Sequence, residues 1–87
     1  MRQMLGRVVI TVNASATLNT VDVLTALFRH ENGDWGEVCN EDWGENDYSA
    51  GQLLRVVSKY TDRNGTKYWI ITEADRSSTC VLLPEDY

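Results

Sequence analysis

Residues 53–72, LLRVVSKYTDRNGTKYWIIT, contain the strongest structural signal in the chain. β-Branched and aromatic residues dominate both halves of this segment, and such residues are typical of strands. The two halves are separated by the polar residues 62–65, DRNG, in which an Asn-Gly pair is the strongest short-range indication of a β-hairpin. The sequence therefore predicts strands over 53–61 and 66–72, joined by a tight turn.

Two further segments extend this hairpin into a sheet. Residues 79–83 follow a polar turn at 73–77 and are mostly apolar up to Pro84, which is expected to end the strand. Residues 6–12, GRVVITV, are also β-branched and apolar, and they predict a strand at one edge. We therefore expect an antiparallel sheet of three to four strands.

Two helices are predicted between the first strand and the hairpin. Apolar residues recur at helical spacing over 20–31, where Asn19 is a suitable N-cap and Gly33 a suitable C-terminal cap. A second helix is expected over 41–50, capped by Asn40 and weakened by Gly44, whereas residues 13–16 are expected to be a connector. The expected fold is a single α+β domain over 1–87, with both helices packed on one face of the sheet.

The overall charge excludes several kinds of partner. The formal net charge of the 87 residues is −5, which argues against direct nucleic-acid binding and against binding to an anionic membrane surface. No apolar run is long enough to cross a bilayer, and the N-terminal residues do not resemble a signal peptide. We therefore expect a cytoplasmic protein whose two cysteines, Cys39 and Cys80, are reduced.

Negative charge is concentrated in one segment. Between residues 31 and 54 there are seven carboxylates and no Lys or Arg. A solvated, solubilising helix face is one interpretation, and an anionic surface that binds a cationic partner is the other. Trp35 and Trp43 lie in the same segment, either as core residues or as apolar anchors of a contact. The predicted partner-binding residues are Asp34, Trp35, Glu37, Glu41, Asp42, Trp43, Glu45 and Asp47.

Other chemistry has little support in the sequence. His30 is the only histidine, and its spacing from Cys39 and Cys80 does not fit a structural zinc site. We therefore predict no catalytic residues, no metal and no cofactor, with a weak Mg²⁺ site among the acids as an alternative. The polar turn that contains Glu73, Asp75 and Arg76 offers the groups of a small hydrolase or nuclease-like enzyme, but it also fits a purely structural turn.

Three stretches carry a resemblance to a known group of proteins. They are residues 29–36, RHENGDWG, residues 69–77, WIITEADRS, and residues 81–87, VLLPEDY. The chain resembles a family of short proteins from bacterial plasmids, phages and integrative elements. This resemblance implies a mobile-element setting, in which small acidic proteins often block CRISPR or restriction systems.

These observations lead to one main functional hypothesis. The chain is expected to be a non-enzymatic inhibitor of a bacterial defence complex, most specifically an anti-CRISPR protein. Its acidic segment would cover a basic nucleic-acid-binding surface on a protein partner. The alternatives are the hydrolase described above and an interaction module of the mobile element, which would form a homodimer through an exposed sheet edge.

Overall fold

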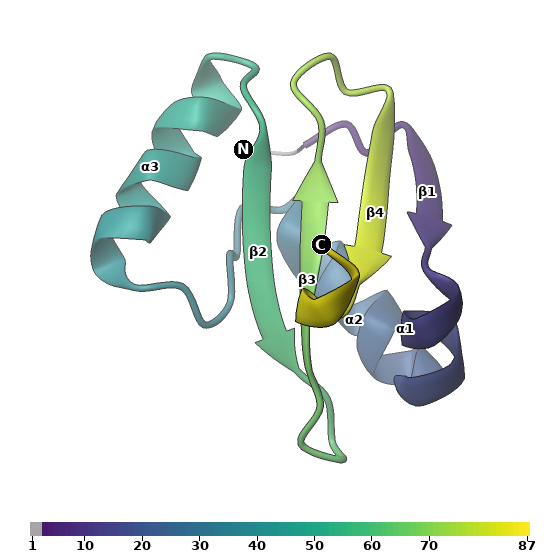
Figure 1. Ribbon diagram of the computed structural model, residues 1–87. Coiled ribbons are helices and arrows are strands. Elements are labelled where there is room, and N and C mark those ends of the chain that lie inside the picture. Colours follow the sequence, from purple (N-terminus) through teal and green to yellow (C-terminus); the bar gives the residue numbers. More distant parts are fainter. Residues whose placement is uncertain (1–2) are drawn as a thin grey trace.

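The computed structural model describes residues 3–87, which fold into a four-stranded mixed sheet with helices on one face and at one edge (Figure 1). Among these residues, no helix is long and apolar enough to cross a membrane. The elements in chain order are β1 (Arg7–Ile10), α1 (Val12–Thr17), α2 (Thr20–Glu31), α3 (Asn40–Gly51), β2 (Val56–Thr61), β3 (Lys67–Thr72), β4 (Ser78–Leu82) and the 3₁₀ turn η1 (Pro84–Asp86).

The sheet has the strand order β1-β4-β3-β2. The predicted hairpin is present as β2 and β3, with Tyr60 opposite Tyr68, and β4 continues it as an antiparallel meander. β1 adds to the far side of β4 in the parallel direction, with Val9 beside Cys80. The sheet is therefore mixed rather than wholly antiparallel, because β1 pairs with a strand that is distant in sequence and runs the same way.

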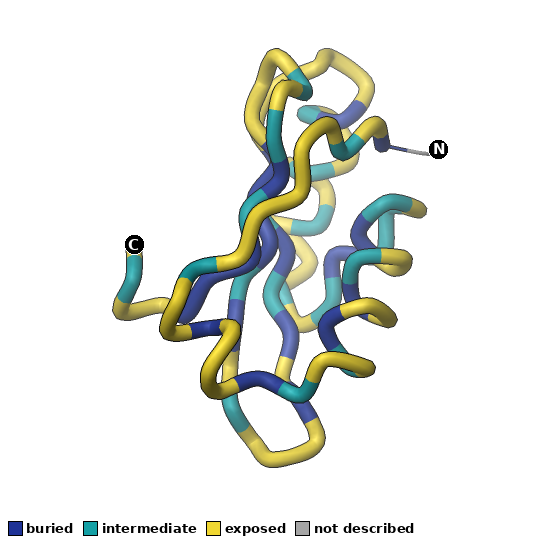
Figure 2. Tube along the Cα trace, turned by 90° about the vertical axis from the view of Figure 1, so that its right-hand side faces the viewer, coloured by how far each residue is buried: buried dark blue, intermediate teal, exposed yellow. Residues whose placement is uncertain are grey.

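The main core lies between the sheet and α2. The helix begins as predicted, since the Asn19 side chain accepts a hydrogen bond from the backbone N–H of Asp22 at 3.1 Å. Val23 and Ala26 of α2 are buried against Ile70 of β3 and other apolar side chains on the same sheet face. Figure 2 shows this buried layer between strands and helix, with exposed residues on the outer surfaces.

The expected connector at 13–16 is instead part of a short helix, α1. The hydroxyl of Thr11 accepts a hydrogen bond from the backbone N–H of Ala14 at 3.1 Å and caps this helix. Ala14 is fully buried in the main core, so tertiary packing stabilises a turn that is too short to form alone. The prediction of an irregular connector was therefore wrong.

α3 differs from its prediction in position and in its cap. It lies along the edge of β2 and not on the sheet face that carries α2 (Figure 1). Asn40 is its first residue, and the N-cap is Cys39, whose side chain makes no capping hydrogen bond. β2 begins at Val56, later than predicted, since Leu53 has a φ of 56° in the left-handed region, which a strand cannot contain.

Candidate functional site

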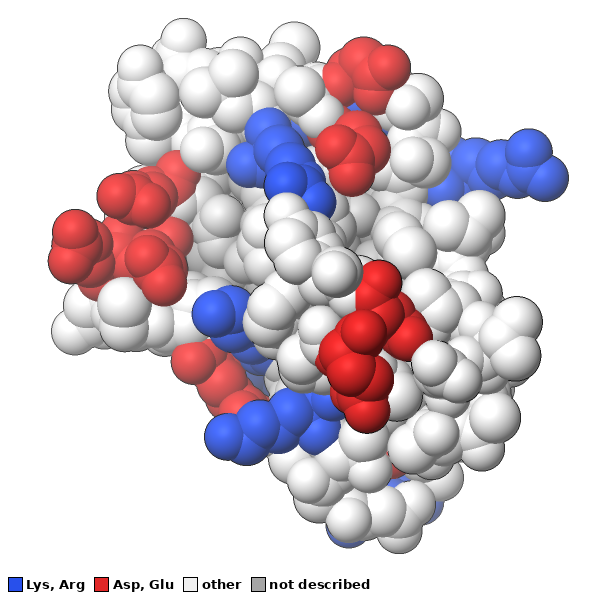
Figure 3. Space-filling view, viewed as in Figure 1, with Lys and Arg blue, Asp and Glu red and all other residues white. Residues whose placement is uncertain are grey.

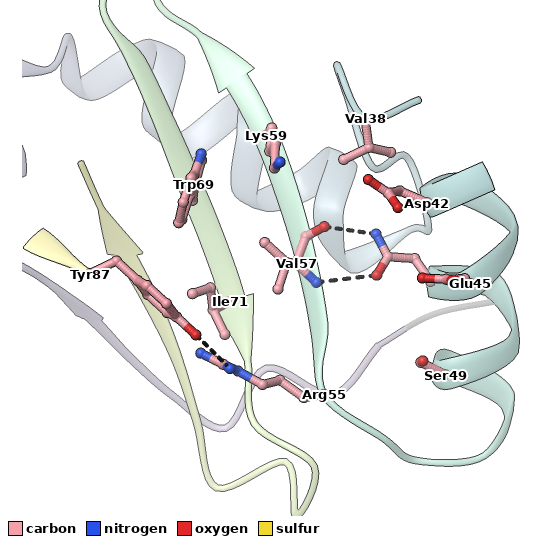
Figure 4. A pocket seen from close by; sticks show the side chains of 11 residues that line it. Val38, Asp42, Glu45, Ser49, Arg55, Val57, Lys59, Trp69, Ile71 and Tyr87 are labelled. Carbon is pink, nitrogen blue, oxygen red and sulfur yellow. Dashed lines mark hydrogen bonds between the residues drawn. The ribbon is translucent and has the colours of Figure 1, made fainter. Parts of the chain in front are cut away.

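Side-chain and backbone groups close the outer edge of β2 and hold α3 against it. The Asn46 amide donates to the Val57 carbonyl at 2.7 Å and accepts from the Val57 N–H at 3.3 Å, as the paired dashed lines in Figure 4 show. Further along the edge, the Lys59 N–H donates to the Trp35 carbonyl at 3.1 Å, and its carbonyl accepts from the Glu37 N–H at 2.7 Å. α3 therefore has a defined position relative to the sheet.

The two tryptophans of the acidic segment belong to a small core between α3 and β2. Trp35 is 1% exposed, and its indole N–H donates to the Asp47 carboxylate at 2.9 Å. It forms a small core with Ala50 and Val56, and the partly buried Trp43 packs against that core. Trp35 therefore has no surface to offer a partner, whereas Trp43 retains some exposed area.

Three of the predicted contact acids are engaged within the chain. Asp34 forms an ion pair with Arg29 at 2.8 Å, and the hydrogen bond from that guanidinium lowers the pKa of the Asp34 carboxyl. Glu37 accepts a hydrogen bond from the Thr61 hydroxyl at 2.8 Å. Asp47 is the acceptor for the Trp35 indole. These three carboxylates stabilise the fold, so their capacity to bind a partner is reduced.

The remaining three acids form what we call the α3 acidic face, which consists of Glu41, Asp42 and Glu45. All three side chains are exposed, and within residues 3–87 none of them takes part in an ion pair. Carboxylates in the first turn of a helix suit the positive end of its dipole, which offsets part of their mutual repulsion. Figure 3 shows acidic side chains gathered over α3.

A groove of about 380 Å³ lies between α3 and the sheet face opposite α2 (Figure 4). Asp42, Glu45 and Ser49 form the helix side, and the aromatic rings of Trp69 and Tyr87 form part of the sheet side. The Lys59 ammonium lies 5.3 Å from the centre of the Trp69 ring. A cationic side chain of a partner can therefore place its methylene groups in the groove and its charge at the carboxylates.

The C-terminal residue closes one end of this groove. The Arg55 guanidinium donates to the Tyr87 hydroxyl at 2.9 Å and lies 5.4 Å from the centre of that ring. Sequence reasoning missed Asn46, Arg55, Lys59 and Tyr87 as residues of the site. Their contributions depend on contacts between distant segments, and no local motif marks them.

The polar groups of the turn considered as a hydrolase site make hydrogen bonds within the chain. Arg76 has a φ of 59°, and its guanidinium donates to the carbonyls of Leu54 at 2.8 Å and Glu73 at 2.9 Å. Asp75 accepts from the backbone N–H of Ser77 at 3.0 Å. These contacts are those of a structural turn. In the part of the chain that the structure describes, no three His, Cys, Asp or Glu side chains are grouped to hold a metal ion.

A scan against protein-family models found no match to this chain. Searches of curated proteins and of solved structures also found none. Function must therefore be inferred from the arrangement of the residues themselves.

Proposed function

We propose that this chain is a non-enzymatic inhibitor of a bacterial defence complex, most specifically an anti-CRISPR protein. It acts in the cytoplasm by placing the α3 acidic face on a basic nucleic-acid-binding surface of its partner. DNA or guide RNA is then excluded, because the partner's Lys and Arg side chains are already occupied.

The observation that carries this proposal is one set of exposed carboxylates that forms no ion pair within residues 3–87, although Arg55 and Lys59 line the same groove. Asp34 is paired with Arg29, but no ion pair within residues 3–87 involves Glu41, Asp42 or Glu45. A face selected for stability alone would gain from a Lys or Arg one turn away, and residues 31–54 contain neither. The uncompensated charge is therefore available to a cationic partner.

The attachment of α3 to β2 supports the same proposal. Asn46 and Asp47 bind the helix to Val57 and Trp35, while the three acids stay exposed, with Asp42 and Glu45 along the groove. A helix held in this way presents its charges in one arrangement, so less conformational entropy is lost on binding. The resemblance to mobile-element proteins suggests which basic surfaces to test, namely those of CRISPR and restriction complexes.

The test is a phage-plating assay in bacteria that carry an active CRISPR or restriction system. The wild-type chain is expected to restore plating in at least one of these strains. The triple variant Glu41→Gln, Asp42→Asn, Glu45→Gln removes three charges and is expected to abolish that restoration. The complex of purified partner and wild-type chain should weaken steeply as salt is raised, because exposed charges are screened.

The matched control adds the same amount of charge away from α3. The double variant Glu85→Lys and Ala74→Lys also changes the net charge by three, and both positions are exposed. This control should inhibit as strongly as the wild type does. The proposal fails if the triple variant inhibits as strongly as the wild type, or if the wild type inhibits no system tested.

A further inference from the structure

Among residues 3–87, no strand pairs with the outer edge of β1. The backbone N–H groups of Arg7 and Thr11 donate inward, to the carbonyls of Ser77 and Val81, each at 3.0 Å. Because backbone groups alternate in direction along a strand, those of Val8 and Ile10 point away from β4. Figure 2 faces this edge and shows β1 as an exposed segment at the front of the molecule. Two donors and two acceptors are therefore open to another strand.

Apolar side chains flank this open edge. Val8 and Ile10 lie beside the buried Thr79 and Val81 and therefore project from the same sheet face as they do, toward α2. They are 45% and 42% exposed, and Leu24 of α2 is 61% exposed. A groove of about 260 Å³ lies between β1 and α2, and among the residues that the structure describes no charged side chain lines it. An apolar patch beside an open strand edge is typical of an interaction surface.

The opposite edge of the sheet cannot play this role. Asn46 satisfies both backbone groups of Val57, and the segment around Gly36 pairs with Lys59. Natural proteins cover or charge their strand edges unless an edge is used, and within the described part of the chain one edge of this sheet is covered and the other is not. The contrast singles out β1 as the edge available for association.

The register of β1 is compatible with a second copy of itself. If two β1 strands pair antiparallel about a two-fold axis at Val9, Val8 of one copy lies opposite Ile10 of the other. These are the residues whose backbone groups point outward, so four hydrogen bonds form across the axis. The axis is perpendicular to the sheet, so the α2 helices of both copies lie on the same face of a continuous sheet.

Charge complementarity supports this pairing. In this register Arg7 of one copy lies opposite Thr11 of the other. The Thr11 hydroxyl donates to the Asp86 carboxylate at 2.6 Å, which places a negative charge beside the incoming Arg7. Arg7 forms no ion pair within residues 3–87. The symmetry generates this cation–carboxylate contact twice.

The acidic surface does not oppose the pairing. The helix α3, which carries the acidic face, lies beside β2, at the edge of the sheet opposite β1 (Figure 1). In the paired arrangement, the two acidic faces are at the far ends of the continuous sheet. At that separation solvent and salt screen their repulsion almost completely.

We propose that two copies of this chain associate as a symmetric dimer through antiparallel pairing of their β1 strands about Val9. The strand contributes few residues, so the interface falls near the lower size limit of stable ones and is expected to dissociate on dilution. Such a dimer would carry two acidic faces, one at each end.

The first experiment tests the position of the axis. Directly opposed residues in a non-hydrogen-bonded antiparallel pair have Cα atoms about 4.5 Å apart, which a disulfide can bridge. The variant Val9→Cys, made with Cys39→Ser and Cys80→Ser, should give a covalent dimer on mild oxidation. Cys80 must be replaced because it lies beside Val9 within the same sheet. The matched control is Val8→Cys in the same background, since Val8 is opposed by Ile10 and not by itself.

The second experiment measures association by sedimentation velocity over a range of protein concentrations. The wild type should shift from monomer to dimer as concentration rises. Arg7→Glu should weaken the dimer about tenfold, because it loses two ion pairs and adds two repulsive contacts. Lys67→Glu makes the same charge change at an exposed position in the hairpin and should leave association unchanged.

Three outcomes would overturn the proposal. The wild type could remain monomeric at the highest concentration that stays in solution. Equal cross-linking of Val9→Cys and Val8→Cys would indicate random collision rather than a defined register. A dimer that is insensitive to Arg7→Glu and does not cross-link through position 9 would use another surface.

Discussion

The side-chain amide of Asn46 pairs with both backbone hydrogen-bonding groups of Val57, as the backbone of a neighbouring strand would. A helix residue thereby takes the place of a fifth strand along β2. This contact joins the α3 acidic face to the hairpin, and it also prevents further strand addition at that edge.

The first prediction concerns this contact. Asn46→Ala leaves the N–H and C=O of Val57 without their partner in a part-buried position. The free energy of unfolding should fall by about 1–3 kcal/mol, as measured by urea denaturation. Asn40→Ala, at an exposed position on the same helix, should change it by less than about 0.5 kcal/mol. Equal losses in the two variants would contradict the role assigned to Asn46.

The second prediction separates the structural acids from the α3 acidic face. Asp47→Ala leaves the buried indole N–H of Trp35 unpaired and should cost about 1–3 kcal/mol, with a change in tryptophan fluorescence. Glu45→Ala removes the same charge from the same helix but should be nearly neutral for stability, since Glu45 is exposed. If Glu45→Ala proved as destabilising as Asp47→Ala, the acidic face would be a structural feature.

The third prediction compares two glycines. Gly44 lies inside α3 with open space around the position of a Cβ atom, so Gly44→Ala should stabilise the chain by about 0.5–1 kcal/mol. Gly36 has a φ of 74°, and a Cβ there would lie 2.1 Å from the Lys59 carbonyl oxygen. Gly36→Ala should therefore destabilise the chain by about 2 kcal/mol or more. Thermal unfolding of both variants checks the opposite signs.

Buried His30 connects α2 to the sheet through a directed chain of hydrogen bonds. Thr79 donates its single hydroxyl proton to the Leu5 carbonyl at 2.7 Å, so it must accept from Thr72. Thr72 in turn accepts from Nε2 of His30 at 2.7 Å, and Nδ1 then accepts from the Ser58 hydroxyl. The network therefore places a proton on Nε2, and burial, which disfavours the charged ring, keeps Nδ1 without one so that it accepts from Ser58.

The fourth prediction follows from this neutral histidine. Burial, with a smaller contribution from Arg76, lowers the pKa of His30 from 6.5 to about 4. The unfolded chain therefore binds a proton more readily than the folded chain between these values. The contribution of neutral His30 to stability should be fully present above pH 6.5. The free energy of unfolding should fall by about 3 kcal/mol as the pH decreases toward 4.

The control for this prediction removes the ionisable group. His30→Gln should be less stable than the wild type at pH 7, but its stability should no longer depend on pH between 6.5 and 4. The carboxyl groups with lowered pKa values, such as Asp34, stabilise the fold throughout this window. Their contribution is lost mainly at lower pH, because their ordinary pKa is 3.8. A wild-type stability that stays constant over this window would contradict the prediction.

Sequence reasoning succeeded where a structure depends on neighbouring residues. The bounds of α2 agree with the cap at Asn19 and the left-handed Gly33, which has a φ of 82°. The β2–β3 hairpin agrees with its Asn-Gly turn, in which Gly65 has a φ of 83°. It was less successful at α1, because burial of Ala14 depends on strands at the other end of the chain.

The candidate site was only partly predictable for the same reason. The concentration of carboxylates was evident in the sequence, but which of them form ion pairs or hydrogen bonds within the chain was not. Asp34 and Asp47 are engaged by Arg29 and by Trp35, and the second of these pairs spans eleven intervening residues. Which carboxylates stay unpaired depends on which cations and donors the fold brings near them.

By itself, the sequence determined the hairpin, the main helix, the α+β class and the acidic character of one segment. These features follow from side-chain type, spacing and local capping, which act over a few residues. Only the tertiary structure decided that β1 joins β4 in parallel, that α3 lies along the β2 edge, and that Trp35 is buried while Glu41, Asp42 and Glu45 are not. Those outcomes depend on which distant surfaces pack together, and pairings over such separations are set by the shape and burial of the whole core.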